Sequence, residues 1–273
     1  MGKKYLKIIE SNNEIIKKTI KSDINLQFFD ENKRFFVKSA QLGKVVIEGD
    51  EHNHLANVMR FKTGEDIILI CNDDYDYYGK INEISKKFTI VDVQKKVNNT
   101  SNPKMEITAF VAANKREPMS LMVRMLSELG VSNFVPVKTK WTQRQDESDK
   151  IERYQKIADQ SAKQCRRSKT LKIFETQTLE EVCRTFEKFD AVFFAYEKED
   201  SLSFEKFLNS CNFINKAPKK IAFIVGPVAG FDTDEAETII KNGAISISLG
   251  KRILKADTAC VTIASIIMSK FDV

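Results

Sequence analysis

The chain has 273 residues, with 44 Lys and Arg against 38 Asp and Glu, a formal net charge of +6, and 42% hydrophobic residues. This length suggests about two domains, and the small number of Gly and Pro residues excludes a disordered or collagen-like chain. The two histidines, His52 and His54, are too few and too close together for a dispersed metal site or a Ser-His-Asp triad. We therefore predict that no metal is bound.

The five cysteines are scattered, odd in number, and contain no C-x-x-C pair. This pattern disfavours both a zinc ribbon and an oxidised, secreted scaffold. The sequence has no N-terminal apolar segment and no apolar run near 18 residues, which disfavours export and membrane spanning. We therefore expect a cytoplasmic protein without a membrane partner.

The first part of the chain has three segments of different character. Residues 1–33 are Lys-rich and are interpreted as an N-terminal extension. Residues 34–97 contain short alternating runs separated by Gly and Asn-Asp turns, which predicts a small antiparallel β-barrel with one helix around Asn53–Phe61. Residues 98–104 are polar and contain Pro, and are therefore predicted to be a linker.

Strands and helices alternate in residues 105–273, which predicts an α/β domain with a parallel sheet covered on both faces. A long helix is expected across Asp146–Ser168. Gly130 and Gly243 fall just past helical patterns, where a left-handed residue is favoured. Residues 232–235 have the spacing of a capping box and should open a helix.

Ligands of open parallel sheets bind beyond the carboxyl ends of the strands. Three segments follow buried strand patterns there, at residues 195–197, 226–230 and 249–252. The two glycines of the second segment allow close backbone approach, and the segment leads into a capped helix. The chain has neither a G-x-G-x-x-G motif after the first strand of this domain nor a G-x-x-x-x-G-K-[ST] motif. The ordinary NAD, ATP and Rossmann-type methyltransferase sites are therefore excluded.

Basic residues cluster at 138–144 and 163–169, and Trp141 and Tyr154 add aromatic faces. Either cluster alone is consistent with a solvated surface. Together they indicate contact with RNA phosphates and bases.

Six segments, taken in their order and spacing, resemble a known family. They are RFFV at 34–37, HLANVMRFKTGEDI at 54–67, SELGVSNFVPV at 127–137, Gln164-x-x-Arg167, GPVAGF at 226–231 and LGKRILKADTA at 249–259. From Arg34 to the C-terminus the chain is similar to the SPOUT (trefoil-knot) RNA methyltransferases, specifically the 16S ribosomal RNA (uracil-N3)-methyltransferases. The resemblance implies a PUA-like β-barrel for RNA, followed by an α/β domain with a C-terminal trefoil knot.

The resemblance also implies S-adenosyl-L-methionine as cofactor, ribosomal RNA of the small subunit as substrate, and a homodimer. By analogy the cofactor pocket is lined by Ala195, Tyr196, Gly226, Pro227, Gly230, Leu249, Gly250, Ile253 and Leu254. Ile253 and Leu254 fit an adenine wall, and equally fit plain core positions.

Three residues of the last motif are candidates for chemistry. Arg252 and Lys255 would stabilise a uracil anion or hold a flanking phosphate. Asp257 would accept a proton or orient Arg252, or would be only a favourable acid at a helix N-terminus. The residues expected to contact RNA are Arg34, Arg60, Lys138, Arg144, Gln164 and Arg167, of which Gln164 and Arg167 also suit a subunit contact. We expect His52 and His54 to be surface or capping residues.

The sequence departs from the family pattern at five positions. The Lys that is usual three residues before the Glu of E-L-G-V is Met125 here. The glycine loop G-P-E-G-G-F has Val228 and Ala229 here, and the last motif has Lys255 and Asp257 in place of Arg and Glu. Lys cannot reproduce the planar, bidentate fork of Arg. Two alternatives therefore stand beside the leading interpretation: a knot methyltransferase that modifies another RNA position, and a non-catalytic RNA-binding member of the fold.

Overall fold

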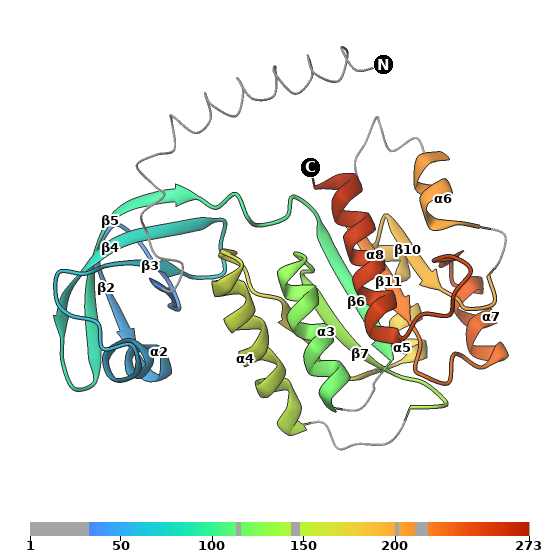
Figure 1. The fold of residues 1–273 in the computed structure, drawn as a ribbon, viewed down its shortest axis with the longest axis horizontal. Coiled ribbons are helices and arrows are strands. Elements are labelled where there is room, and N and C mark those ends of the chain that lie inside the picture. The colour runs from blue at the N-terminus through green and yellow to red at the C-terminus, as the bar shows by residue number, and fades with distance from the viewer. Residues whose placement is uncertain (1–32, 113–115, 143–147, 200–201, 211–217, 273) are drawn as a thin grey trace, which may run out of the picture. The chain divides into compact units, whose positions relative to one another are not determined.

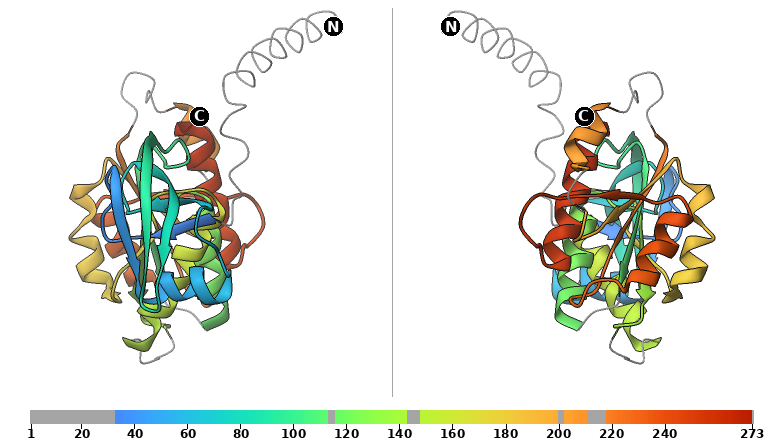
Figure 2. Two further views of the ribbon diagram at one scale, coloured as in Figure 1. Left: turned by 90° about the vertical axis from the view of Figure 1, so that its left-hand side faces the viewer. Right: turned by 90° about the vertical axis from the view of Figure 1, so that its right-hand side faces the viewer.

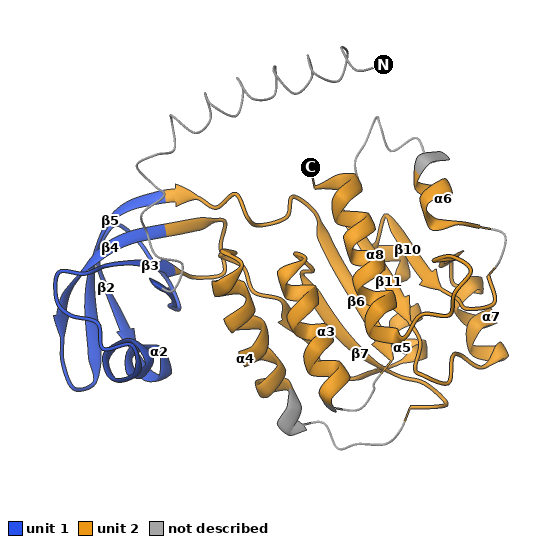
Figure 3. Cartoon of the chain, in the orientation of Figure 1, with its two compact units in different colours: residues 1–69, 77–96 blue, residues 70–76, 97–273 orange. Residues whose placement is uncertain are grey.

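The chain forms two compact units (Figure 3). Unit 1 comprises residues 1–69 and 77–96, and unit 2 comprises residues 70–76 and 97–273. The computed structural model describes residues 33–112, 116–142, 148–199, 202–210 and 218–272 (Figure 1). The predicted N-terminal extension lies outside the described residues, except for Lys33.

Unit 1 is built on a five-stranded sheet with the strand order β1-β3-β4-β5-β2. Its strands are β1 (Arg34–Phe36), β2 (Gly43–Glu48), β3 (Asp66–Ile70), β4 (Tyr75–Ile84) and β5 (Phe88–Asn98). The pairs β2/β5 and β3/β4 are antiparallel. In β2, Val45 and Ile47 are buried while their neighbours are not, as expected for a strand with one face on a core. The predicted antiparallel, barrel-like sheet is confirmed.

The helix of unit 1 differs from the prediction of Asn53–Phe61. It begins at Gly49 with α2 (Gly49–Asn53) and continues as the π-helix η2 (His54–Val58). Arg60 has a left-handed backbone with a φ of 56°, and this conformation ends the helix before Phe61. His52, expected near the surface, is buried, and its Nδ1 lies 2.9 Å from the hydroxyl of Thr89.

Unit 2 contains a seven-stranded sheet with the order β12-β10-β11-β6-β7-β8, and β9 also pairs with β7. Every pairing recorded within this sheet is parallel. Its strands are β6 (Glu106–Ala112), β7 (Asn133–Lys138), β8 (Lys172–Ile173), β9 (Gln177–Thr178), β10 (Ala191–Ala195), β11 (Lys220–Val225) and β12 (Ile245–Ile247). The helices are α3 (Arg116–Glu128), α4 (Ser148–Gln164), α5 (Leu179–Cys183), η3 (Phe186–Lys188), α6 (Phe204–Ser210), α7 (Thr233–Lys241) and α8 (Ala256–Phe271).

Successive residues of the central strands enter two different cores, one on each face of this sheet. In β11, Ile221, Phe223 and Val225 pack with residues of α3, α4, α6 and α8. Ala222 and Ile224, which point the other way, pack with residues of α5, η3 and α7. Figure 2 shows helices on both sides of the sheet. The predicted doubly covered parallel sheet is therefore confirmed.

The predicted helix signals occur where the sequence placed them. Gly130 and Gly243 have φ values of 92° and 98°, and each follows the end of a helix. Asp232 is the N-cap of α7, and together with Glu235 it forms the complete capping box. The helix predicted to end at Ser168 ends instead at Gln164, because Arg166 adopts a left-handed φ of 66°.

Residues 98–104, for which we predicted a linker, are hydrogen-bonded within unit 2. The side-chain Nδ2 of Asn99 donates to the carboxylate of Asp76 over 2.8 Å. The side-chain Nδ2 of Asn102 donates to the hydroxyl of Ser168 over 2.7 Å. These side-chain contacts attach both the segment and the 70–76 turn to the second unit.

Arg167 is a correction to the predicted RNA-binding set, because its side chain is only 3% exposed. One Nη atom donates to the carbonyl oxygens of Ser127 at 2.7 Å and Val131 at 3.1 Å. Ser127 lies in the last turn of α3, where helix carbonyls lack partners within the helix, and Val131 follows three residues after the helix ends. Burial lowers the pKa of the Arg167 guanidinium below its ordinary value. Arg167 therefore closes the end of α3 from inside the protein.

Replacing Gly130 by Ala should destabilise the protein more than replacing Gly243 by Ala. Both residues have a left-handed backbone, which costs a residue with a Cβ about 1 kcal/mol or more. A Cβ on Gly130 would also lie 2.7 Å from Pro103 and 2.9 Å from Met268, whereas one on Gly243 would meet nothing within 4 Å. We expect Gly130→Ala to cost about 1 kcal/mol more in urea unfolding. Equal losses would mean that this helix end repacks freely.

Arg167→Ala should lower the free energy of unfolding by about 2–4 kcal/mol, because two buried carbonyls lose a charged donor and a cavity remains. Gln164→Ala is the matched control, since Gln164 is exposed at the end of the neighbouring helix and should change stability by less than about 0.5 kcal/mol. Chemical denaturation of both variants measures the change in the free energy of unfolding. A stable Arg167→Ala protein would contradict the structural role.

Candidate functional site

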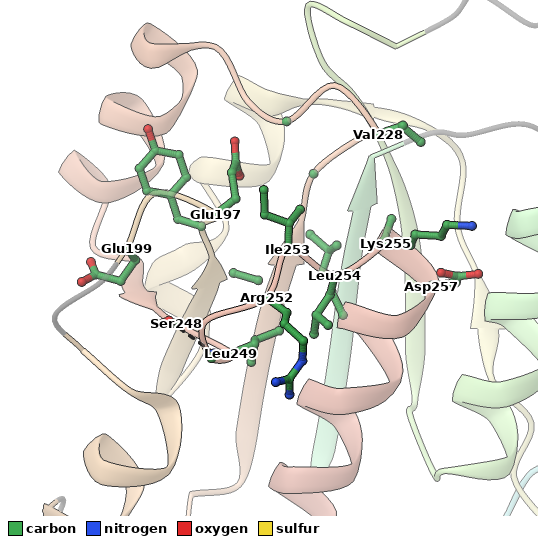
Figure 4. A pocket seen from close by; sticks show the side chains of 18 of the residues that line it. Glu197, Glu199, Val228, Ser248, Leu249, Arg252, Ile253, Leu254, Lys255 and Asp257 are labelled. Atoms are coloured by element: carbon green, nitrogen blue, oxygen red, sulfur yellow. Dashed lines mark hydrogen bonds between the residues drawn. The ribbon is translucent and has the colours of Figure 1, made fainter.

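A pocket of about 580 Å³ lies in unit 2 at the carboxyl ends of β10, β11 and β12 (Figure 4). Its walls come from the segments that follow these three strands and from the first turn of α8. All the residues predicted for the cofactor line it: Ala195, Tyr196, Gly226, Pro227, Gly230, Leu249, Gly250, Ile253 and Leu254. Segments about 20–60 residues apart in the chain are thus brought to one cavity, as expected for parallel strands.

The connection after β10 is held against the end of β12. The Ser248 backbone N–H donates to the Leu202 carbonyl over 2.8 Å, and the Phe204 N–H donates to the Ser248 carbonyl over 3.1 Å. The ring of Tyr196 stacks on Phe194, with ring centroids 5.0 Å apart. This side of the pocket is therefore fixed by both backbone hydrogen bonds and aromatic packing.

The glycines of the 226–230 loop are needed for close approach within the protein itself. A Cβ on Gly226 would lie 2.8 Å from the Phe231 ring. Gly230 has a φ of 76°, its N–H donates to the Pro227 carbonyl over 2.9 Å, and a Cβ there would collide with the Glu197 carboxylate. These contacts fix the conformation of the 226–230 loop, which leads to α7.

The lining carries side chains of both charges together with apolar ones. Glu197 and Glu199 lie on one side of the pocket, and Lys255 lies with Asp257 on the opposite side at the start of α8 (Figure 4). Ile253 and Val228 are apolar yet 87% and 90% exposed. The pocket therefore presents acids, cations and uncovered apolar side chains to one ligand.

Five lining residues lie outside every segment that the sequence analysis selected, namely Pro118, Glu199, Val225, Ile247 and Ser248. Glu199, Val225, Ile247 and Ser248 stand within two residues of those segments, so their place follows from the same strand ends. Pro118 belongs to α3 and reaches the pocket only through tertiary packing, for which the sequence has no local signal.

The three candidate catalytic residues all line this pocket. Arg252 and Lys255 are exposed, and their side chains point in different directions (Figure 4). The carboxylate of Asp257 accepts from the Thr258 backbone N–H over 2.8 Å. Asp257 and Arg252, both described, share neither a hydrogen bond nor an ion pair, so the suggestion that Asp257 orients Arg252 has no supporting contact.

The predicted RNA-contacting residues separate into exposed and buried groups. Arg60, Lys138 and Gln164 are exposed. Arg34 is only 5% exposed, and so, like Arg167, it is corrected from a surface contact to a buried residue. Arg144 lies outside the described residues.

The aromatic residues beside the basic clusters also separate. Tyr154, a residue of α4, is buried in the core, whereas Trp141 is 52% exposed. Of this pair, only Trp141 offers an aromatic surface to a partner.

Lys140 connects the segment after β7 to the start of α7. Its Nζ lies 2.8 Å from Asp232 Oδ2, and its backbone N–H donates to Glu235 Oε1 over 2.7 Å. The hydrogen bond between the two side chains raises the pKa of Lys140 above 10.5 and lowers the pKa of Asp232 below 3.8. The pair therefore stabilises the fold between these pH values. That contribution is lost as pH falls through the lowered pKa or rises through the raised one.

Two negative findings concern the described part of the chain. It contains no group of three or more His, Cys, Asp or Glu side chains placed to hold a metal ion. Within the same residues, none of the helices has the length and apolar character needed to cross a membrane.

Individual relatives resemble the chain over most of its length. The ribosomal RNA small subunit methyltransferase E of Rickettsia conorii is 28% identical over 233 residues, covering 84% of this chain and 92% of that protein. The Bacillus subtilis protein of the same name is 26% identical, covering 78% and 85%. The crystal structure of that methyltransferase from Neisseria gonorrhoeae, bound to S-adenosyl methionine, has a TM-score of 0.78 at 18% identity, covering 87% of this chain and 97% of that chain. This structural likeness shows a shared fold.

Family models match both parts of the chain. Residues 47–94 match an RNA methyltransferase PUA domain, and residues 100–268 match an RNA methyltransferase domain. The second match spans more than half of the sequence and includes every residue that lines the pocket. The chain therefore belongs to the RNA methyltransferase family that joins this domain to a PUA domain.

Proposed function

We propose that the chain is an S-adenosyl-L-methionine-dependent methyltransferase that methylates N3 of a uridine in the decoding region of 16S ribosomal RNA. The observation that carries the proposal is the convergence of residues 195–197, 226–230 and 249–255 on one pocket. Support for the substrate comes from relatives named as ribosomal RNA small subunit methyltransferases. We further propose that the protein acts in the cytoplasm, where such RNA would be met.

The residues of the pocket fit this cofactor. Its volume of about 580 Å³ suits a small molecule, because such sites commonly occupy about 300–1,000 Å³. Leu254, one of the two residues predicted as a wall for adenine, would form that wall together with Leu249, whereas Ile253, the other, is 87% exposed. Glu197 and Glu199 supply negative charge that suits a ligand carrying sulfonium and ammonium groups.

The side chains at the pocket also suit methyl transfer to an acidic ring nitrogen. When bound in the pocket formed by residues 195–197, 226–230 and 249–254, the cofactor would supply an electrophilic sulfonium methyl group as the methyl donor. Arg252 and Lys255 would stabilise the negative charge that the uracil ring acquires when N3 loses its proton. Asp257, in the first turn of α8, is the carboxylate proposed to accept that proton.

Arg252→Ala should separate catalysis from cofactor binding. We expect turnover to fall about 100-fold or more, because a donor that stabilises transition-state charge is removed, while the dissociation constant for S-adenosyl-L-methionine stays within a few-fold. Calorimetric titration and methyl transfer to unmethylated small ribosomal subunits measure the two quantities. Lys241→Ala, an exposed change on α7 away from the pocket, should alter neither. Equal losses of binding and turnover in Arg252→Ala would mean that Arg252 is structural.

Further outcomes separate the alternative functions. Absence of cofactor binding at millimolar concentration would overturn both enzyme proposals and favour a non-catalytic RNA-binding protein. Mapping of the methylated nucleotide by mass spectrometry would identify an enzyme for another RNA position. A deletion strain whose decoding-region uridine keeps its methyl group would contradict the proposed substrate.

We also propose a homodimer, as the resemblance implies. Its support in the structure is the uncovered apolar surface of Val228 and Ile253 at the pocket mouth. Sedimentation velocity should give a mass near twice 31.3 kDa, and Val228→Asp should shift it toward the monomer. A wild-type monomer at micromolar concentration would contradict the dimer.

A further inference from the structure

Trp141 is the only tryptophan of the chain, and it lies just after β7 in unit 2. About half of its surface is exposed. The activity proposed above assigns it no role. Large aromatic side chains left open to solvent on a fixed backbone are typical of surfaces that bind a partner.

The sheet topology puts Trp141 on the same edge as the pocket. β7 is parallel to β6, and β6 is parallel to β11, so the carboxyl ends of all three strands face the same way. β7 is two strands away from β11 in the sheet order, a spacing of roughly 10 Å. The segment that begins with Lys138 therefore leaves the sheet beside the pocket loops.

The backbone on both sides of the indole is held in place. The Thr139 N–H donates to the Thr142 hydroxyl over 2.9 Å, and the two threonine hydroxyls lie 2.8 Å apart. Between them, the Lys140 backbone N–H and Nζ are bound to Glu235 and Asp232 at the start of α7. The ring is thus presented at little further cost in backbone entropy when a ligand binds.

Lys140 also contacts the ring of Trp141, with Nζ 5.4 Å from the ring centroid. Because this ammonium group is already paired with Asp232, it positions the indole and is not free to neutralise a phosphate. Lys138, which is exposed three residues before Trp141, remains as a cation for the backbone of a polyanion. An aromatic face beside an accessible cation matches single-stranded RNA, whose bases stack on such rings.

We propose that Trp141 is a stacking platform for an unpaired nucleobase that flanks the nucleotide held in the pocket. The proposal rests on the RNA substrate proposed above and adds a binding subsite outside the cofactor pocket. A target base taken out of a folded RNA leaves its neighbours unstacked, and the indole would replace part of that lost stacking.

The single tryptophan permits a direct test with an unpaired RNA oligonucleotide that contains the target uridine. Tryptophan emission reports Trp141 alone, so we expect quenching that saturates together with binding measured independently by fluorescence anisotropy of labelled RNA. Trp141→Ala should weaken RNA binding at least about fivefold, the lower end for loss of one base stack. Trp141→Phe keeps an aromatic face and should stay within about threefold of wild type.

A matched control and a kinetic measurement distinguish stacking from a structural role. Leu121→Ala removes another exposed apolar side chain, on α3, and should leave RNA affinity unchanged. For methyl transfer, Trp141→Ala should raise KM for RNA and leave kcat at saturating RNA nearly unchanged. A lowered kcat with unchanged KM would indicate a different role and overturn the proposal.

The proposal is also overturned if emission is unchanged at saturating RNA, or if Trp141→Ala binds RNA as tightly as wild type. Its failure is distinguishable from failure of the proposed activity. Quenching and loss of RNA affinity in Trp141→Ala would support the stacking subsite even if no methyl group were transferred. Methyl transfer by a Trp141→Ala protein with wild-type RNA affinity would overturn the subsite alone.

Discussion

The rest of unit 2 depends on the parallel pairing of β12, β10 and β11. Ala195, the last residue of β10, is in register with Val225 on one side and Ile247 on the other. Each of these residues also ends its strand, so the three connections leave the sheet at the same level. Backbone hydrogen bonds between these strands therefore fix the position of the pocket. The side chains of the segments that follow the strands determine only which ligand the pocket can bind.

Much of this architecture was accessible from the sequence because its signals are local. A glycine just past a helix, as at Gly130, and the capping box at Asp232 depend on the few residues around them. Predicting the pocket lining required an additional rule, that parallel strands present their carboxyl ends together, and this rule selected three segments. The family resemblance then selected the individual residues within those segments. Pro118 was missed because its place in the pocket depends on how α3 packs, which no short window of sequence records.

The errors in the predicted RNA contacts share one physical origin: residue type indicates charge, whereas burial depends on distant partners. Arg167 stands in a basic cluster, yet it is buried because carbonyl oxygens about 40 residues earlier, at Ser127 and Val131, need a donor. Backbone conformation caused the other errors. The left-handed residues Arg60 and Arg166 redirect the chain sooner than helical periodicity suggests, and neither is a glycine that would have marked the turn.

The two acids that open α7 each serve two neighbours. Asp232 accepts the backbone N–H of Asp234 and also the ammonium of Lys140, while Glu235 closes the capping box and binds the Lys140 backbone. A helix start and a separate surface segment therefore share the same carboxylates. A substitution at either position would have two effects. It would weaken the start of α7, and it would release the segment after β7 from its present conformation. These positions should consequently change more slowly in evolution than their exposure alone would allow, and together with position 140.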